Sequence, residues 1–446
     1  PLDREPHSVI GSSCMGATVL GGLANNSGGA LLRRGPAYTQ MALFAQLDEG
    51  GQLRLINNLG VRLGHEPRHM LERLERGEFV VQDIEHDPER WGSDRSYVQR
   101  VREIDSDVPA RFNANPERLF EASGCAGRIV VFAARLDTFP KDAKTRVFYI
   151  GSRDPAELTQ LRRHILSRFE HLPVAGEYMH RDMFDVAEAY GKDAFLIIHY
   201  LGTGRLPRLV EFKRRFDALV SRLGLRGEGA SERLLQRVSG LLPDHLPPRM
   251  KTWRHRFEHH LLLKMAGEGI PEAAAYLGSI FPSRAGDVFE CTDEEAEKAF
   301  LHRFVAAGAA MRYRTVHRRR IEDIVALDVA LRRNDRNWFA SPPSEVAGDI
   351  HLALCYGHFF CHVFHHDYLL RKGSHAAIVK HRLLRWFEGR GAEYPAEHNV
   401  GHLYPAKPAM LDFYRGLDPC NRFNPGIGQT SKHADWSERG STIVRQ

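Results

Sequence analysis

The sequence lacks paired cysteines and long apolar runs. Its six cysteines form no CxxC pair, and we interpret them as small buried thiols in a reducing compartment. A membrane-spanning helix needs about 18 consecutive apolar residues, and the best apolar runs, at 128–136 and 304–311, are far shorter. These absences exclude a disulfide-stapled scaffold. We therefore expect any association with a membrane to be peripheral.

Repeats and low-complexity tracts are also missing, and the composition is that of an ordinary soluble protein. Of the 446 residues, 43% are apolar and 26% are charged, which excludes wholesale disorder and a collagen-like fibre. At about 150 residues per domain, the length predicts roughly three domains. The first residue is Pro1 rather than Met, so we expect a processed N-terminus or an internal fragment.

The net charge of +6 is concentrated in one segment. Residues 205–256 contain 13 Lys and Arg against five Asp and Glu, alternating with Leu, Val and Phe. Basic amphipathic helices of this kind suit the surface of an anionic membrane. A solvated basic face on an ordinary helical subdomain is the alternative. Nucleic acid is a third possibility, but no nucleic-acid-binding motif accompanies the charge, and we predict no nucleic-acid partner.

Strand and helix signals alternate along the rest of the chain. Residues 41–58 read as a hairpin, and 128–136 as a buried strand. Two strand–helix units follow: strand 145–151 with a helix capped by Asp154, and strand 288–291 with a helix opened by a Thr292–Glu295 capping box. This mixture predicts an α+β protein whose cap is interrupted by the basic helical segment.

A glycine-rich stretch lies near the N-terminus. Residues 11–29 hold six glycines in nineteen positions, and closely spaced glycines let backbone N–H groups approach an anionic ligand. The pattern is neither GxGxxG nor a P-loop. It fits an anion-binding segment or a glycine-rich packing element equally well.

Histidines are abundant, 24 in all, and gather in the C-terminal third. On a strand, His358, His362 and His366 would share one face and His365 the other; on a helix, His358, His362 and His365 would fall together. Glu397-His398 and His402 follow some thirty residues later. Imidazoles with a carboxylate suit a divalent metal such as Zn²⁺ or Mn²⁺, although a role for each His in an ordinary polar network is the simpler alternative.

Several long stretches resemble a known family. They are FEASGCAG (120–127), LPVAGEYMHR (172–181), LPPRMK (246–251), EHHLLLKMAG (258–267), ALRRND (330–335), YPAEHNVGHLY (394–404) and NPGIG (424–428). Together with 11–40, they resemble vanillyl-alcohol-oxidase-type FAD proteins, and more narrowly the bacterial respiratory quinone-dependent D-lactate dehydrogenases. The resemblance implies FAD in a two-lobed α+β domain whose first lobe would precede Pro1.

The resemblance also implies site residues. The expected flavin contacts are Gly11, Thr18, Gly28 and the main chain of Val131. A likeness to related FAD-linked D-2-hydroxyacid dehydrogenases implies metal ligands at His358, His365, Glu397 and His398. The chain departs from those relatives at Asn399, where they have Gly, and at the bulky Phe359 and Phe360.

The implied reaction is oxidation of D-lactate to pyruvate, with electrons passing from FAD to ubiquinone or menaquinone. An Arg suits the substrate carboxylate; we predict Arg332, with Arg333 and Arg181 as alternatives. The proton acceptor is predicted to be His398 or His402. We expect a peripheral protein at an anionic membrane, on the cytoplasmic face of the bacterial inner membrane. The alternatives are a D-2-hydroxyacid dehydrogenase with a soluble acceptor and a non-catalytic basic membrane-binding protein.

The domain boundaries that we expect follow from these assignments. They are an FAD-binding part at 1–137, cap segments at 138–179, 257–294 and 319–388, membrane-binding inserts at 180–256 and 295–318, and a return to the FAD-binding part at 389–446.

Overall fold

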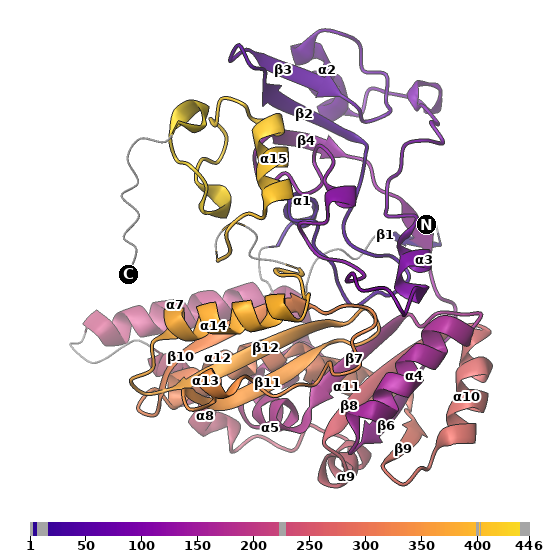
Figure 1. Cartoon of the computed structure of the whole chain (residues 1–446), viewed down its shortest axis with the longest axis vertical. Coiled ribbons are helices and arrows are strands. Elements are labelled where there is room, and N and C mark those ends of the chain that lie inside the picture. Colours follow the sequence, from indigo (N-terminus) through magenta and orange to yellow (C-terminus); the bar gives the residue numbers. More distant parts are fainter. Residues whose placement is uncertain (1–2, 7–16, 223–228, 398–400, 402, 438–446) are drawn as a thin grey trace.

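A computed structural model describes the chain except for residues 1–2, 7–16, 223–228, 398–400, 402 and 438–446 (Figure 1). It contains a large part, built on a seven-stranded sheet, and a smaller part, built on a three-stranded sheet. The strands of the smaller sheet all precede residue 137, and α15 (Pro408–Leu417), far along the chain, packs against them. The fold mixes helices and sheets, as expected for an α+β protein, and the pairings between its named strands are antiparallel.

The seven-stranded sheet is antiparallel throughout. Its strands run in the order β10 (Ile321–Ala330), β12 (Val363–Arg371), β11 (Ile350–His358), β7 (Ala175–His180), β8 (His259–Ala266), β6 (Thr145–Ser152) and β9 (Gly286–Glu290). Strands distant in the sequence therefore lie side by side.

Helices cover both faces of this sheet, because its strands alternate apolar side chains between two cores. Phe148 and Ile150 of β6 pack toward α4 (Pro155–Arg168), α10 (Gly269–Ile280) and α14 (Ala376–Gly389). Val147 and Tyr149 pack on the opposite face. That face is covered by α5 (Arg181–Tyr190), α6 (Lys192–Leu201), α9 (Pro248–Arg256), α11 (Asp293–Phe304) and α12 (Ala306–Val316). In Figure 1 α4 and α14 lie in front of the sheet. We call the second face the insert face.

The smaller sheet has the order β3 (Leu53–Asn57), β2 (Ala42–Leu47) and β4 (Val130–Ala134). The hairpin expected at 41–58 is confirmed, with Leu43 opposite Asn57. The strand at 128–136 was expected to be buried, and that is wrong. It is an edge strand of the described sheet, with Val130 41% and Phe132 44% exposed.

Both strand–helix units are confirmed. Asp154 accepts a hydrogen bond from the backbone N–H of Ala156 at 2.8 Å, which caps α4. Thr292 and Glu295 form the reciprocal capping box that opens α11. The remaining elements are β1 (Arg4–Pro6), α1 (Val19–Ala24), α2 (Pro67–Arg76), α3 (Tyr97–Arg102), β5 (Thr138–Pro140), α7 (Leu206–Arg222), α8 (Ala230–Ser239), α13 (Ser344–Ala347) and α15 (Pro408–Leu417).

The five cysteines that the structure describes are all buried and free, which confirms the prediction of buried thiols for these residues. Cys14 lies outside the described residues. Among the described residues, no helix combines the length and the apolar character needed to cross a membrane.

Three buried imidazoles lie on the insert face, at His245, His260 and His302. Burial lowers the pKa of His245 to about 4 and that of His302 to about 3, and it holds the pKa of His260 well below its usual value. All three are therefore neutral in the folded protein at neutral pH.

These histidines predict a loss of stability in mild acid. The unfolded chain takes up a proton at each His near pH 6.5, whereas the folded chain does not, so their stabilisation is present above about 6.5 and is lost as pH falls. We expect His302 alone to contribute a decline of about 1.4 kcal/mol per pH unit between pH 6 and 4. Denaturant unfolding at pH 7, 6 and 5 measures this slope, and His302→Leu should flatten it. A wild-type free energy of unfolding that stays constant from pH 7 to 5 would contradict the prediction.

Candidate functional site

A hairpin brings His358 and His365 together. His358 ends β11, and His365 lies in β12 directly opposite Tyr356. His358 and Tyr356 are two residues apart on one strand, so all three side chains share the insert face of the sheet. Both sequence expectations for 358–366, a continuous strand and a helix, are therefore wrong. Residues 359–362 form the turn, with His362 at a positive φ of 54°.

Glu397 approaches the two histidines from the C-terminal segment. Its Oε1 lies 3.1 Å from Nε2 of His358, and its Oε2 lies 3.8 Å from Nε2 of His365. One ligand atom from each of the three residues lies within 4.8 Å of the others. Glu397 is buried and both histidines are nearly so. Three of the four predicted metal ligands thus meet, and the fourth, His398, lies outside the described residues.

Each histidine is oriented by a carboxylate behind it. Nδ1 of His358 lies 2.6 Å from Oε1 of Glu177, and Nδ1 of His365 lies 2.6 Å from Oδ1 of Asp328. A carboxylate at Nδ1 fixes the proton there and leaves Nε2 to face the centre of the site. In both histidines this arrangement directs Nε2 toward Glu397.

Two arginines pair with the carboxylates of this site. Arg111 forms a buried ion pair with Glu397, and Nε of Arg303 lies 2.9 Å from Oε2 of Glu177. Burial by itself would raise the pKa of Glu397, but His358 and Arg111 outweigh it and hold that pKa well below its usual range. Burial would likewise lower the pKa of His358, but Glu177 and Glu397 outweigh it and raise that pKa to about 10. Without a metal, the site therefore pairs ionised carboxylates with cations.

The glycine-rich stretch reaches this site through Arg111. A Cβ added at Gly28 would lie 1.6 Å from Nη1 of Arg111, and the carbonyl of Gly29 accepts a hydrogen bond from Nη2 at 3.2 Å. Thr18 caps α1 by accepting a hydrogen bond from the N–H of Gly21. Val131 lies on β4 and packs in one apolar cluster with Ala24 at the end of α1. Of the predicted flavin contacts, Gly11 lies outside the described residues.

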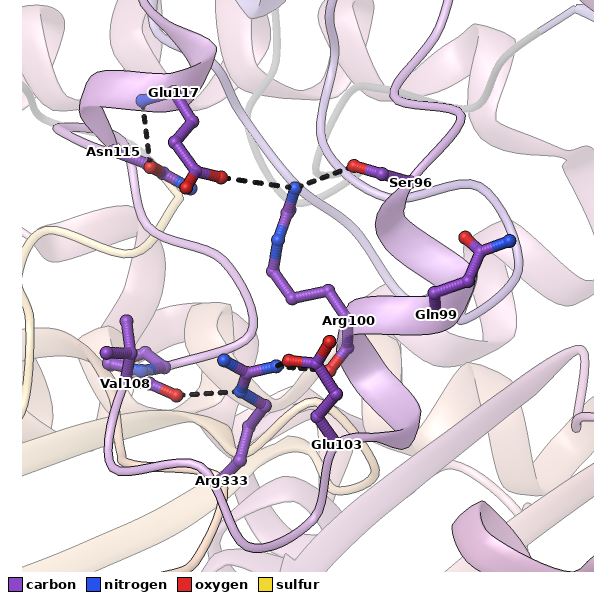
Figure 2. Close-up of a pocket in the computed structure, with 9 residues that line it drawn as sticks. Ser96, Gln99, Arg100, Glu103, Val108, Asn115, Glu117 and Arg333 are labelled. Atoms are coloured by element: carbon purple, nitrogen blue, oxygen red, sulfur yellow. Dashed lines mark hydrogen bonds and ion pairs between the residues drawn. The ribbon is translucent and has the colours of Figure 1, made fainter.

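The predicted arginine anchors have different surroundings. Figure 2 shows Arg333 in a surface pocket, where its Nε donates to the carbonyl of Val108 at 2.8 Å and its Nη1 to Glu103 at 2.6 Å. Arg181 pairs with Glu258 at 3.1 Å. Both therefore hold the fold together. Arg332 differs: it packs against Gly391, and its buried Nε has no hydrogen-bond partner among the described residues.

Sequence reasoning missed Arg111, Glu177, Arg303 and Asp328. Glu177 and Asp328 were visible as acidic residues within strand-like apolar segments, and such residues are rarely buried without a partner. No local pattern could indicate Arg111 or Arg303. The predicted bases His398 and His402 lie outside the described residues.

Comparison with known proteins places this chain in a family. Residues 147–436 match the family described as "D-lactate dehydrogenase, membrane binding". The chain is 54% identical to the quinone-dependent D-lactate dehydrogenase of Escherichia coli over 98% of this chain and 76% of the relative. It is 51% identical to the enzyme of that name from Haemophilus influenzae, over 98% of this chain and 78% of the relative. For the one from Corynebacterium glutamicum the identity is 44%, over 97% of this chain and 76% of the relative.

Solved structures give a much weaker likeness. A p-cresol methylhydroxylase with bound substrate covers 93% of this chain, and this chain covers 70% of it, at 12% identity and a TM-score of 0.45. That value is too low to bear on fold or function. The matches along the sequence are far stronger, and by them the chain belongs to the family of membrane-binding, quinone-dependent D-lactate dehydrogenases.

Proposed function

We propose that the chain oxidises D-lactate to pyruvate and passes the electrons to a membrane quinone. The observation that carries this proposal is the 54% identity, over 98% of the chain, to an enzyme named for that activity. The buried cluster of His358, His365 and Glu397 supports it, since a 2-hydroxy acid needs groups that bind its oxygens and accept its hydroxyl proton.

FAD would accept the hydride from the substrate carbon. The described residues fit a flavin at the edge of the small sheet. β4 leaves one edge unpaired in the described sheet and exposes Val130 and Phe132 beside it, which suits a flat apolar ring and a main-chain contact at Val131. Gly28 lets the backbone lie against Arg111, where any side chain would collide. We assign Thr18, Gly28 and Val131, with Gly11, to an FAD-binding domain at 1–137 and 389–446.

A divalent metal, Zn²⁺ or Mn²⁺, would be held by His358, His365 and Glu397, joined by His398. Two imidazole nitrogens and a carboxylate oxygen are a donor set that both metals accept. The carboxylates of Glu177 and Asp328 at Nδ1 are the partners that metal-binding histidines usually have. In this arrangement the metal would bind the hydroxyl and carboxylate of D-lactate.

The remaining catalytic roles stay predictions. Arg332 would bind the substrate carboxylate, and its unpartnered buried Nε supports this role because a buried donor without an acceptor is costly. His402 would take the hydroxyl proton, or His398 would do so where it does not bind a metal.

The basic insert would bind an anionic membrane surface, and we place the protein on the cytoplasmic face of the inner membrane. The insert comprises 180–256 and 295–318, flanking cap segments 138–179, 257–294 and 319–388. It exposes apolar side chains among the basic residues, including Tyr200, Leu201, Leu219 and Leu241. Ubiquinone or menaquinone, the acceptors that we propose, reside in that membrane.

Steady-state kinetics with the two enantiomers of lactate tests the function. We expect reduction of a short-chain quinone with D-lactate, and a rate with L-lactate at least a hundredfold lower. Bound flavin should be visible in the absorption spectrum. Equal rates with both enantiomers would contradict the assignment. Activity with a soluble dye alone would favour the soluble-acceptor alternative, and a colourless protein that binds vesicles would favour the non-catalytic one.

A further inference from the structure

A pocket of about 340 Å³ opens on the insert face of the large sheet, between strands β6 and β8 and helix α11. Pockets for small organic ligands usually measure about 300–1,000 Å³, so this one is large enough for a six-membered ring and its substituents. Its apolar wall is formed by Val147, Cys291, Ala296 and Phe300. The charged side chains that line it are Arg146, Lys264, Asp293 and Glu297.

All but one of these charged side chains are paired within the protein. Nη1 of Arg146 lies 3.2 Å from Oδ1 of Asp293. Oε1 of Glu297 lies 3.0 Å from Nδ1 of His199 on α6. Lys264 differs, because its ammonium forms no ion pair or hydrogen bond with the described residues. The pocket therefore offers one unpaired cationic donor to a ligand.

A neutral planar ring that carries a carbonyl oxygen matches this lining. Nζ of Lys264 lies 5.9 Å from the centre of the Phe300 ring, so a ligand stacked on Phe300 would have an oxygen within reach of the ammonium. An anionic ligand matches less well, because the carboxylates of Asp293 and Glu297 line the same pocket. Reduction of a quinone builds negative charge on its oxygens, and a fixed cation beside them stabilises that charge as it develops.

Backbone pairing places the pocket one strand away from the glycine-rich stretch. Lys264 on β8 pairs with Ala175 on β7, and Ala175 pairs on its other side with Leu31. Neighbouring strands lie about 4.8 Å apart, so the backbones of Lys264 and Leu31 are about 10 Å apart. Leu31 follows Gly28, which we assigned to the FAD-binding domain, by three residues. Electrons from a flavin bound there would cross a single strand to reach the pocket.

The helical wall of the pocket lies in the membrane-binding insert that we propose. The lining residues of α11 fall in its second segment, 295–318, and the contact between Glu297 and His199 joins α11 to the last turn of α6. α6 continues to Tyr200, which is 73% exposed, and Leu201, which is 50% exposed. An isoprenoid tail attached to a ring in the pocket would therefore emerge beside apolar side chains that we expect to face the bilayer.

We propose that this pocket receives the headgroup of the membrane quinone, an inference that rests on the proposed function. The Lys264 ammonium donates a hydrogen bond to one ring carbonyl, and Phe300 contacts the face of the ring. The two electrons and two protons removed from D-lactate, with FAD as carrier, convert the quinone to quinol. Both carbonyl oxygens become hydroxyls, and no further oxidant is required.

Kinetics with two acceptors tests the site. We expect Lys264→Gln to raise the KM for a short-chain ubiquinone at least tenfold relative to the KM for D-lactate, which is measured with a soluble dye. Phe300→Ala should change this ratio in the same direction, and Lys264→Arg, which keeps the cation, should restore most of it. Lys298→Gln is the matched control, because Lys298 lies on α11 outside the pocket lining and pairs with Glu294 at 2.6 Å. It should leave the ratio unchanged.

Photolabelling gives a readout that does not depend on turnover. An azidoquinone should label β6, β8 or α11 in the wild-type holoenzyme, with excess ubiquinone as competitor, and labelling should fall in Lys264→Gln. An unchanged ratio of KM values in Lys264→Gln, or labelling confined to other elements, would overturn the proposal. Weaker co-sedimentation of Lys264→Gln with anionic vesicles at an unchanged KM for quinone would also overturn it, because Lys264 would then bind a lipid headgroup. A wild-type enzyme that oxidises no D-lactate even with the dye would instead refute the proposed function.

Discussion

Replacing Glu397 by Gln is expected to lower kcat/KM for D-lactate at least a hundredfold. The carboxylate neutralises Arg111 and contacts both His358 and His365. An amide removes the charge but not the volume, so buried cations lose their partner. Breaking a buried pair in this way costs about 3–5 kcal/mol, so the free energy of unfolding should also fall. Steady-state kinetics, denaturant unfolding and metal analysis of the same preparation measure the three consequences.

The control for this substitution is Glu393→Gln. Glu393 lies four residues away and pairs with Lys407 in a partly exposed position, where an ion pair is worth about 0–1 kcal/mol. It should leave kcat/KM and stability nearly unchanged. Full activity in Glu397→Gln would show that the cluster is not the reacting centre. Loss of activity with unchanged metal content would assign Glu397 to substrate or Arg111 rather than to a metal.

The second large effect is expected from Gly28→Ala. A Cβ at this position would lie 1.6 Å from Nη1 and 2.2 Å from Cζ of Arg111. Arg111 cannot move freely, because it is buried and holds Glu397, so a single methyl group displaces the whole ion pair. We expect the variant to lose at least tenfold in kcat/KM and to retain less flavin after purification.

A second glycine separates steric collision from the general effect of the substitution. Gly278 lies on the exposed side of α10, with no atom within 4 Å of an added Cβ. Gly278→Ala should keep full activity and raise the free energy of unfolding by about 0.5–1 kcal/mol, because alanine favours the helix. Wild-type activity and flavin content in Gly28→Ala would refute the close contact with Arg111.

Local signals predicted much of the fold. The caps at Asp154 and Thr292 and the hairpin at 41–58 depend on neighbouring residues, so the sequence displayed them. The prediction that 128–136 is buried was wrong, because an apolar run does not reveal whether another element covers it. β4 is an exposed edge among the described strands.

The site was predictable only in part, because the sequence does not show which distant segments pack together. The resemblance led to His358, His365 and Glu397, and the structure brings these three together. The arrangement of these three residues could not be predicted from the sequence. A periodic pattern suggests that 358–366 is one strand or one helix, whereas a turn divides this segment. Arg111 and Arg303 reach the site from distant segments, and only the packing of sheet against helix and loop selects them.

The origin of the site residues has one more consequence. Arg111 and Glu397 come from loop segments outside the sheets, whereas His358, His365 and the carboxylates behind them lie on strands of the large sheet. Neither the strands nor the loops alone hold a complete set of site residues. The site therefore depends on how these loops are held against the sheet. A change that loosens the loops would lower turnover while the sheet stays folded.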